Sequence, residues 1–425
     1  MPSLEPIASK KNESVEAGFD DDADPELVEL LRQHFGLGAK SSTPASPETR
    51  VLEGAQYVFD NAIDVALSPA GVKEAAEFIW LRMQKTAYST QTWLEHELHP
   101  KTKDEGTVDF IFTMDLLNFS FWSEKQDESE RFCIDYRGKK WTGYSSLVAA
   151  LQRALDEGIP ITTPDFWVNE TECTEEVLKH VFRSATDEEI PMFKERVQCL
   201  REAGDVLCNE FGGSFANCID SADYSAAGLV NLVAESFDCF RDETVFHGRR
   251  VRLYKRAQIL VADLWACFNG EDYGEFHDID KITMFADYRI PQMLHQLGCL
   301  RYAPPLESHI KSLKEIQPGS NWEIEMRGTS IWCVELIKRE IEKRHPEAKT
   351  ARKTSVSEPD GHLAQAENSE QPGDTEEHQT EKDRPQRTYG VNAILIDFFL
   401  YDTMKELEQK KDESLPHHRT RSIWY

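Results

Sequence analysis

An aspartate between aromatic side chains is the residue in this sequence whose type and setting best suit chemistry. Asp287 lies in the segment Phe285-Ala286-Asp287-Tyr288-Arg289, shortly before a proline that suits the first turn of a helix. One interpretation is an ordinary helix cap, in which the carboxylate accepts hydrogen bonds from free backbone amides. The other is a carboxylate in a dry aromatic pocket, where such a group becomes useful in catalysis. The segment alone leaves both open.

Two more aspartates, Asp397 and Asp402, lie in the strongly apolar run from residue 392 to 402. A buried carboxylate is costly unless it is paired or hydrogen-bonded. On a helix, a separation of five residues rotates the side-chain direction by about 140°, so the two side chains need separate partners. A guanine-like base edge, with a ring N–H and an exocyclic amine, would be a suitable partner. A buried arginine elsewhere in the core is the alternative.

Lys255 and Asp263 form another candidate pair, on the amphipathic segment from residue 253 to 268. They are a little over two helical turns apart, so both lie toward one side of the helix without touching. The alternative is that they are solvated charges on an exposed helix face. His96 is a weaker candidate, because an isolated histidine in such a segment is more often a surface residue than a ligand.

Most of the elements that would position these residues have helical periodicity. It is found at residues 75–84, 144–156, 193–211, 226–236, 253–268, 291–297, 331–343 and 394–409. Two segments look like strands, residues 108–113 and 132–136, and the second ends in a plausible hairpin turn, Arg137-Gly138-Lys139. Gly212 and Gly213 are interpreted as a helix stop rather than a phosphate cradle, because no lysine follows them. We predict a mainly α fold, one helical domain with a small β element.

Two segments differ from the rest in composition. Residues 1–50 are rich in acidic, serine and proline residues, with one short amphipathic stretch at 26–35. Residues 347–388 contain no aromatic residue and few large aliphatic ones, so they cannot bury enough apolar surface to offset their ordering entropy. We therefore predict a disordered acidic extension at 1–50, a disordered insertion at 347–388, and a single catalytic domain made of 51–346 and 389–425.

Composition excludes several classes of function. The formal net charge of −28 would repel the phosphate backbone of DNA or intact tRNA, which favours a small ligand and no stable nucleic acid complex. No apolar run approaches the roughly 18 residues needed to cross a bilayer, so we expect a cytoplasmic protein without a membrane partner. The nine cysteines are dispersed, and metal and nucleotide signatures such as H-E-x-x-H and G-x-G-x-x-G are missing. No metal and no cofactor are therefore expected.

Seven long segments, in this order, resemble the queuosine salvage family, the queuosine 5′-phosphate N-glycosylases. The resemblance covers about residues 55 to 345 and 389 to 425. It is carried by DFIFTMDLLNFSFW (109–122), YRGKKWTGYSSLVAALQRALDEGIPIT (136–162), FGGSFANC (211–218), YKRAQILVADLW (254–265), ITMFADYRIPQ (282–292), MRGTSIWCVELI (326–337) and IDFFLYD (396–402).

The resemblance implies an activity, a fold and a set of site residues. Members of the family release the 7-deazaguanine base queuine from queuosine 5′-phosphate for reuse in tRNA modification, without a metal or cofactor, and their helical fold is similar to that of DNA glycosylases. Asp287 matches the catalytic carboxylate and Lys255 a lysine associated with it. The positions that match ligand-binding residues are His96, Phe285, Asp287, Asp397, Phe398 and Asp402. The family often has tyrosine where this chain has Phe398, so a hydroxyl contact there is absent.

The chemistry of such a reaction fits these residue types. Breaking a ribosyl C–N bond builds positive charge on the sugar, which a carboxylate beside C1′ stabilises or attacks. Queuine has carbon in place of N7, so help for the leaving base must come from hydrogen bonds elsewhere, for which Asp397 and Asp402 are candidates. The cationic arm of queuine suits an acidic pocket. The 5′-phosphate requires a local cation, and Lys255 and Arg289 are the candidates.

Two other functions stay open at this stage. A glycosylase that acts on a base within a nucleic acid would agree with the implied fold, but the acidic composition disfavours it. A non-catalytic helical adaptor would leave the carboxylates of Asp397 and Asp402 without a reason to be buried.

Overall fold

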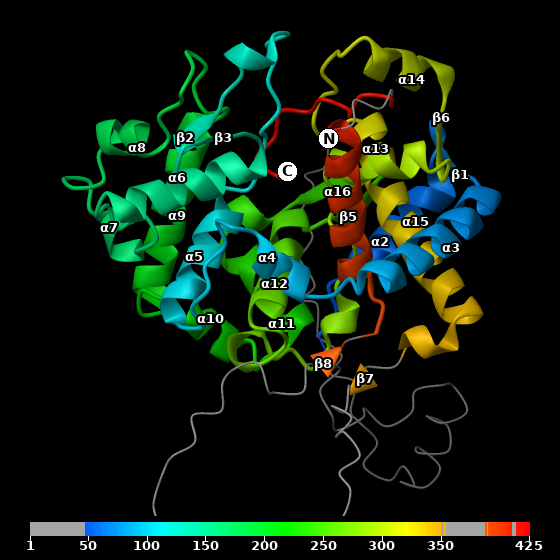
Figure 1. Cartoon of the computed structure of the whole chain (residues 1–425), viewed down its shortest axis with the longest axis horizontal. Coiled ribbons are helices and arrows are strands. Elements are labelled where there is room, and N and C mark those ends of the chain that lie inside the picture. The colour runs from blue at the N-terminus through cyan, green and yellow to red at the C-terminus, as the bar shows by residue number, and fades with distance from the viewer. Residues whose placement is uncertain (1–46, 350–351, 354–386, 389, 410–413) are drawn as a thin grey trace, which may run out of the picture. The chain divides into compact units, whose positions relative to one another are not determined.

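Helices build most of the chain in the computed structural model, as the periodicity predicted (Figure 1). The structure describes residues 47–349, 352–353, 387–388, 390–409 and 414–425. The described helices are α2 (Val51–Asn61), α3 (Pro69–Thr86), α4 (Gln91–Glu95), α5 (Glu105–Leu116), α6 (Tyr144–Asp156), α7 (Pro164–Val168), α8 (Glu175–Val181), α9 (Phe193–Glu210), α10 (Ala216–Ser221), α11 (Ala226–Ser236), α12 (Lys255–Cys267), α13 (Arg289–Gln296), α14 (Pro304–Lys311), α15 (Asn321–Arg344) and α16 (Ala393–Gln409).

The β structure consists of short two-stranded antiparallel sheets. The pairs are β1 (Val65–Leu67) with β6 (Leu300–Tyr302), β2 (Ile134–Tyr136) with β3 (Lys139–Trp141), β4 (Glu243–Phe246) with β5 (Arg249–Arg252), and β7 (Arg352–Lys353) with β8 (Arg387–Thr388). The predicted hairpin is confirmed, because Tyr136 lies opposite Lys139 and the turn residues Arg137 and Gly138 both have positive φ. The mainly α class with a small β element is therefore confirmed.

The predicted strand at residues 108–113 is wrong, because the whole segment lies inside α5. Asp104 begins this helix by accepting a hydrogen bond from the N–H of Thr107 at 2.9 Å. Every residue from Phe110 to Leu116 is buried, so apolar side chains surround the helix on all sides. A helix buried on every face has no polar stripe, and its short apolar segments cannot be told from a buried strand by periodicity.

Two buried helices organise the interior. α15 packs against α2, α3, α13 and α16, and α12 packs against α4, α5 and α11. α16, red in Figure 1, follows the segment that was predicted as an insertion and returns to the core beside α13 and α15. All nine cysteines are unpaired, and all except Cys208 are buried. Within the described residues, every helix is too short or too polar to span a bilayer.

The described structure reaches slightly into both segments of unusual composition. Thr49 is buried, and the carbonyl of Glu48 accepts a hydrogen bond from Asn231. At the other segment, the carbonyl of Ala348 accepts a hydrogen bond from the N–H of Val391 at 2.8 Å. The predicted amphipathic stretch at 26–35 and most of the predicted insertion lie outside the described residues.

Candidate active site

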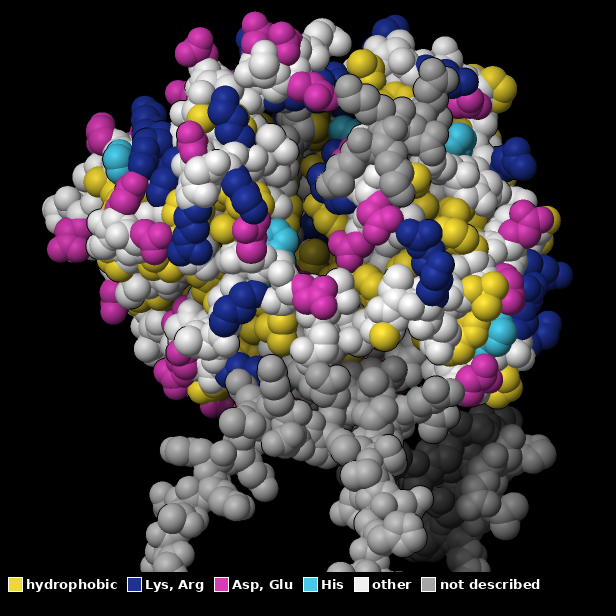
Figure 2. Space-filling model, in the orientation of Figure 1, with side chains coloured by type: hydrophobic (Ala, Val, Ile, Leu, Met, Phe, Trp, Pro, Cys, Tyr) yellow, Lys and Arg dark blue, Asp and Glu magenta, His cyan; other side chains and the backbone are white. Residues whose placement is uncertain are grey.

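A cavity of about 780 Å³ lies between α4, α12, α16 and the loop that leads into α13. Figure 2 shows a hollow in the face viewed, with acidic side chains gathered along one side of it. Seven residues predicted from four separate segments of the chain line this cavity together. They are His96, Lys255, Phe285, Asp287, Asp397, Phe398 and Asp402.

Asp287 combines the two interpretations that its sequence left open. Its Oδ1 accepts hydrogen bonds from the N–H groups of Arg289 at 2.8 Å and Ile290 at 2.9 Å, so it caps α13. Among the described residues, none donates a hydrogen bond to Oδ2, and the side chain lines the cavity. Burial raises the pKa of this carboxyl, while the charge of Lys255 and the two capping hydrogen bonds oppose the increase. Oδ1 is thus held by the backbone of α13, and Oδ2 is available to a ligand in the cavity.

Lys255 is the first residue of α12, and its buried side chain lines the same cavity as Asp287. Burial lowers the pKa of the ammonium, and Asp287 is the nearby charge that most strongly opposes this, followed by Asp115. The ammonium and the carboxylate therefore stabilise each other in a setting where either charge alone would be costly.

Asp397 and Asp402 have separate partners, as the helix geometry predicted, and neither partner is an arginine. Oδ2 of Asp397 accepts a hydrogen bond from the N–H of Phe285 at 3.0 Å. Burial and the neighbouring charge of Asp287 raise the pKa of Asp397 well above its ordinary value. Oδ2 of Asp402 accepts a hydrogen bond from the hydroxyl of Tyr88 at 2.5 Å. Burial thus favours the protonated form of Asp397, while the charge of Lys255 favours the ionised form of Asp287.

Aromatic rings supply flat apolar walls for the cavity. The rings of Phe285 and Phe398 lie 6.0 Å apart, tilted by 50°. The ring of His96 stacks on that of His99 at 4.4 Å, and its Nε2 lies 3.3 Å from Oγ of Ser145. Burial lowers the pKa of His96, so this ring is neutral near neutral pH. These surfaces suit a flat heterocycle.

Arg289 does not line the large cavity. It lines a cavity of about 50 Å³ that shares Lys255, Asp287 and Lys405 with the large one. Its guanidinium already forms an ion pair with Glu408. Lys405, on α16, lines both cavities and lies 3.5 Å from Glu408.

Further residues line the large cavity. Asp263 lines it together with Lys255, so their predicted placement on one side of α12 is confirmed, and the alternative of solvated charges is wrong because both are buried. Burial and the neighbouring Asp115 raise the pKa of Asp263 well above its ordinary value. Tyr88 and Lys405 also line the cavity, and their own segments contain no signal for it. The described residues include no group of three or more His, Cys, Asp or Glu side chains arranged to hold a metal ion.

The sequence is similar to proteins of one family over most of its length. A family model described as queuosine salvage protein matches residues 98–425. A Schizosaccharomyces pombe protein named queuosine 5′-phosphate N-glycosylase/hydrolase is 39% identical over 390 residues, which cover 89% of this chain and 100% of that protein. A Nematostella vectensis protein of the same name is 40% identical, covering 88% of this chain and 97% of its own. One from the bacterium Sphaerobacter thermophilus is 35% identical, covering 83% and 95%.

Proposed function

Because the chain belongs to the queuosine salvage protein family, we infer that it hydrolyses the N-glycosidic bond of queuosine 5′-phosphate and releases queuine for tRNA modification. The observation that carries this inference is the convergence of seven predicted residues on one cavity that contains a carboxylate with a free oxygen. The volume of about 780 Å³ falls within the range typical of small-molecule sites.

We assign the central role to Asp287. In the reaction, water adds to C1′, the C1′–N bond breaks, and its electron pair leaves with the base, which takes up a proton. The free Oδ2 of Asp287 stabilises the positive charge on the sugar, either through space or as a nucleophile. The charge of Lys255 favours the ionised form of this carboxylate and so opposes the effect of burial on its pKa.

The departing base needs a proton or a strong hydrogen bond, and Asp397 is our candidate to supply it. We assign it the acidic role because burial and the charge of Asp287 raise its pKa well above the ordinary value, and we assign the ionised role to Asp287 because Lys255 favours its negative charge. Asp402 and Asp263 supply further carboxyl groups on the cavity wall for the base and its cationic arm.

The 5′-phosphate is expected to bind toward the small cavity, because three cations border it. These are Lys255, Arg289 and Lys405. Lys255 and Lys405 line both cavities, whereas Arg289 lines only the small one, so the lysines are the better placed cations. This assignment extends the sequence-based candidates by Lys405.

The chain is proposed to act in the cytoplasm on the free nucleotide. Nine unpaired cysteines are typical of a reducing compartment. The formal charge of −28 opposes a stable complex with tRNA or DNA.

The test is incubation of the purified full chain with queuosine 5′-phosphate, followed by chromatographic detection of free queuine. The Asp287→Asn variant is the matched control, and parallel samples contain the nucleoside or queuosine-modified tRNA. Release from the nucleotide by the wild type alone supports the proposal. Release from tRNA and not from the nucleotide would show a nucleic acid glycosylase, and a folded protein that neither binds nor cleaves any of these would show a non-catalytic adaptor.

A further inference from the structure

One buried residue outside both cavities holds the start of the helix that carries Lys255. The backbone carbonyl of Asp242 accepts hydrogen bonds from the N–H groups of Leu253 at 3.0 Å and Tyr254 at 3.2 Å. Its side-chain Oδ2 accepts a hydrogen bond from the backbone N–H of Lys255 at 3.1 Å. Tyr254 has a φ of 47°, a left-handed conformation that is unfavourable for a bulky side chain. Asp242 therefore binds three consecutive backbone amides and stabilises a turn whose conformation is unfavourable by itself.

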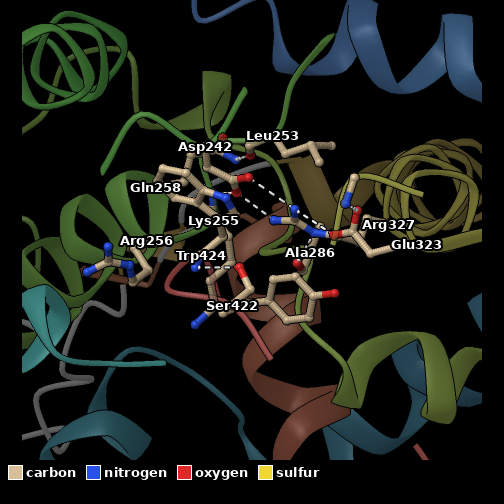
Figure 3. Close-up of polar contacts among 12 residues, drawn as sticks. Asp242, Leu253, Lys255, Arg256, Gln258, Ala286, Glu323, Arg327, Ser422 and Trp424 are labelled. Carbon is tan, nitrogen blue, oxygen red and sulfur yellow. Dashed lines mark hydrogen bonds and ion pairs between the residues drawn. The ribbon is translucent and has the colours of Figure 1, made fainter. Parts of the chain in front are cut away.

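A buried arginine connects that turn to the loop that carries Asp287 (Figure 3). Arg327, on α15, directs Nη1 and Nη2 at the two carboxylate oxygens of Asp242, at 3.0 Å and 2.5 Å. Its Nε donates to the carbonyl of Ala286 at 2.8 Å. Ala286 immediately precedes Asp287 in the chain. The guanidinium of Arg327 thus connects the two backbone segments that carry Lys255 and Asp287, through Asp242 on one side and Ala286 on the other.

From these contacts we infer that Asp242 and Arg327 are positioning residues for hydrolysis. We name this pair the clamp; it sets the distance between the Lys255 ammonium and the Asp287 carboxylate. The inference rests on the proposed function, because it takes Asp287 as the catalytic carboxylate and Lys255 as the cation that favours its ionised form. The clamp lines neither cavity; it holds backbone groups beside them, and Arg327 also packs against the ring of Tyr425, which borders the small cavity.

The chemistry of the guanidinium explains why an arginine holds this place. Its donors lie in one rigid plane, so it binds a carboxylate with two hydrogen bonds and a carbonyl in another direction at the same time. Glu323 also pairs with Nη1 at 3.1 Å, and the ring of Tyr425 lies 4.3 Å from the guanidinium carbon. A lysine at position 327 would retain the charge without the fork, leaving Asp242 or Ala286 unsatisfied.

The test is the Arg327→Lys variant of the full chain, measured by steady-state hydrolysis of queuosine 5′-phosphate as a function of pH. We expect kcat to fall about 10-fold to 100-fold, because a displacement of about 1 Å between reacting groups has this effect, while KM changes little. Asp242→Asn is the second variant, and it decides the question alone if Arg327→Lys does not fold.

The pH profile separates positioning from general destabilisation. Asp287 faces Lys255 from α12, Asp397 and Tyr401 from α16, and Tyr288 and Arg289 from its own segment. The charge of Lys255 contributes most to lowering the pKa of Asp287, so a longer distance between the two groups raises that pKa. The acidic limb of kcat is therefore expected to move to higher pH in the clamp variants.

Glu325→Gln is the matched control. Glu325 is equally buried on the same helix, and its Oε2 accepts hydrogen bonds from the N–H groups of Ile63, Asp64 and Val65 at 3.0, 2.7 and 3.1 Å. These residues line neither cavity. The control should lose stability while it keeps the wild-type kcat and acidic limb.

The possible results separate the two proposals. If the wild type does not hydrolyse the nucleotide, the proposed function fails and the role of the clamp fails with it. If the wild type is active and a folded clamp variant keeps its kcat and acidic limb, only the clamp inference is overturned. An equal loss of kcat in Glu325→Gln also overturns it, because the effect would then reflect stability.

Discussion

Replacing Asp287 by asparagine or by alanine separates the two tasks of this side chain. Asparagine keeps an Oδ1 that can accept both capping hydrogen bonds, from Arg289 at 2.8 Å and Ile290 at 2.9 Å, but has no negative charge. Alanine loses the charge and the cap. Both variants should lose hydrolysis, and only alanine should lose the contribution of the cap to the free energy of unfolding.

The magnitudes follow from the two kinds of interaction. Loss of an N-terminal cap costs about 0.5–2 kcal/mol, so the alanine variant should be less stable than the asparagine variant by about that amount. Both variants also remove the carboxylate that most strongly opposes the effect of burial on Lys255, so both should be less stable than the wild type. The difference in stability between asparagine and alanine therefore reports the cap. Loss of the carboxylate that stabilises the sugar cation should lower kcat about 1000-fold, or about 4 kcal/mol.

The assay combines denaturant unfolding at neutral pH with chromatographic measurement of queuine release under saturating queuosine 5′-phosphate. An asparagine variant that keeps kcat within about tenfold of the wild type would refute the catalytic role, since a tenfold change corresponds to only about 1.4 kcal/mol. Equal stability of the asparagine and alanine variants would refute the capping role.

Three further predictions follow from the cavity. Because the pKa of Asp397 is raised in the folded state, the protein should lose stability as pH rises above the ordinary pKa of an aspartate, about 3.9, toward neutrality. Asp397→Asn should reduce this slope in pH-dependent denaturant unfolding, leaving the part that Asp263 and Asp287 contribute, and an unchanged slope would contradict the prediction. Lys405→Met should raise KM about tenfold for queuosine 5′-phosphate and leave KM for the nucleoside unchanged, since only the nucleotide carries the phosphate that Lys405 is proposed to bind; equal effects on both substrates would place the phosphate elsewhere. Tyr88→Phe removes the hydrogen bond to Asp402 and should weaken queuine binding measured by calorimetry, whereas unchanged affinity would show that Asp402 does not need this partner.

The helices of the core were predictable because most of them keep one polar face. Residues 144–156 match α6 fully, and the stop predicted at Gly212 and Gly213 is confirmed, since both have positive φ just after α9. The failure at α5 has the opposite cause, because that helix is buried all round. Strands β1, β4, β5 and β6 were not predicted, since three or four residues are too few to establish an alternating pattern.

The site was predictable only as far as local sequence and family resemblance reach. The buried setting of Asp397 follows from its apolar neighbours, and its hydrogen bond to Phe285 does not, because that partner lies 112 positions away in the chain. The contact of Arg327 with Asp242 spans 85 positions. Pairings of this kind are decided by tertiary packing. The similarity to DNA glycosylases stays a prediction.

The position of α16 in the chain has a consequence for biosynthesis. This helix supplies Asp397, Phe398, Asp402 and Lys405 to the cavity, so no nascent chain has a complete site until α16 has been made. A product terminated before α16 would expose the surfaces of α13 and α15 that this helix packs against. Such truncated chains should be both inactive and prone to aggregate, which makes them substrates for chaperones and proteases rather than partly active enzymes.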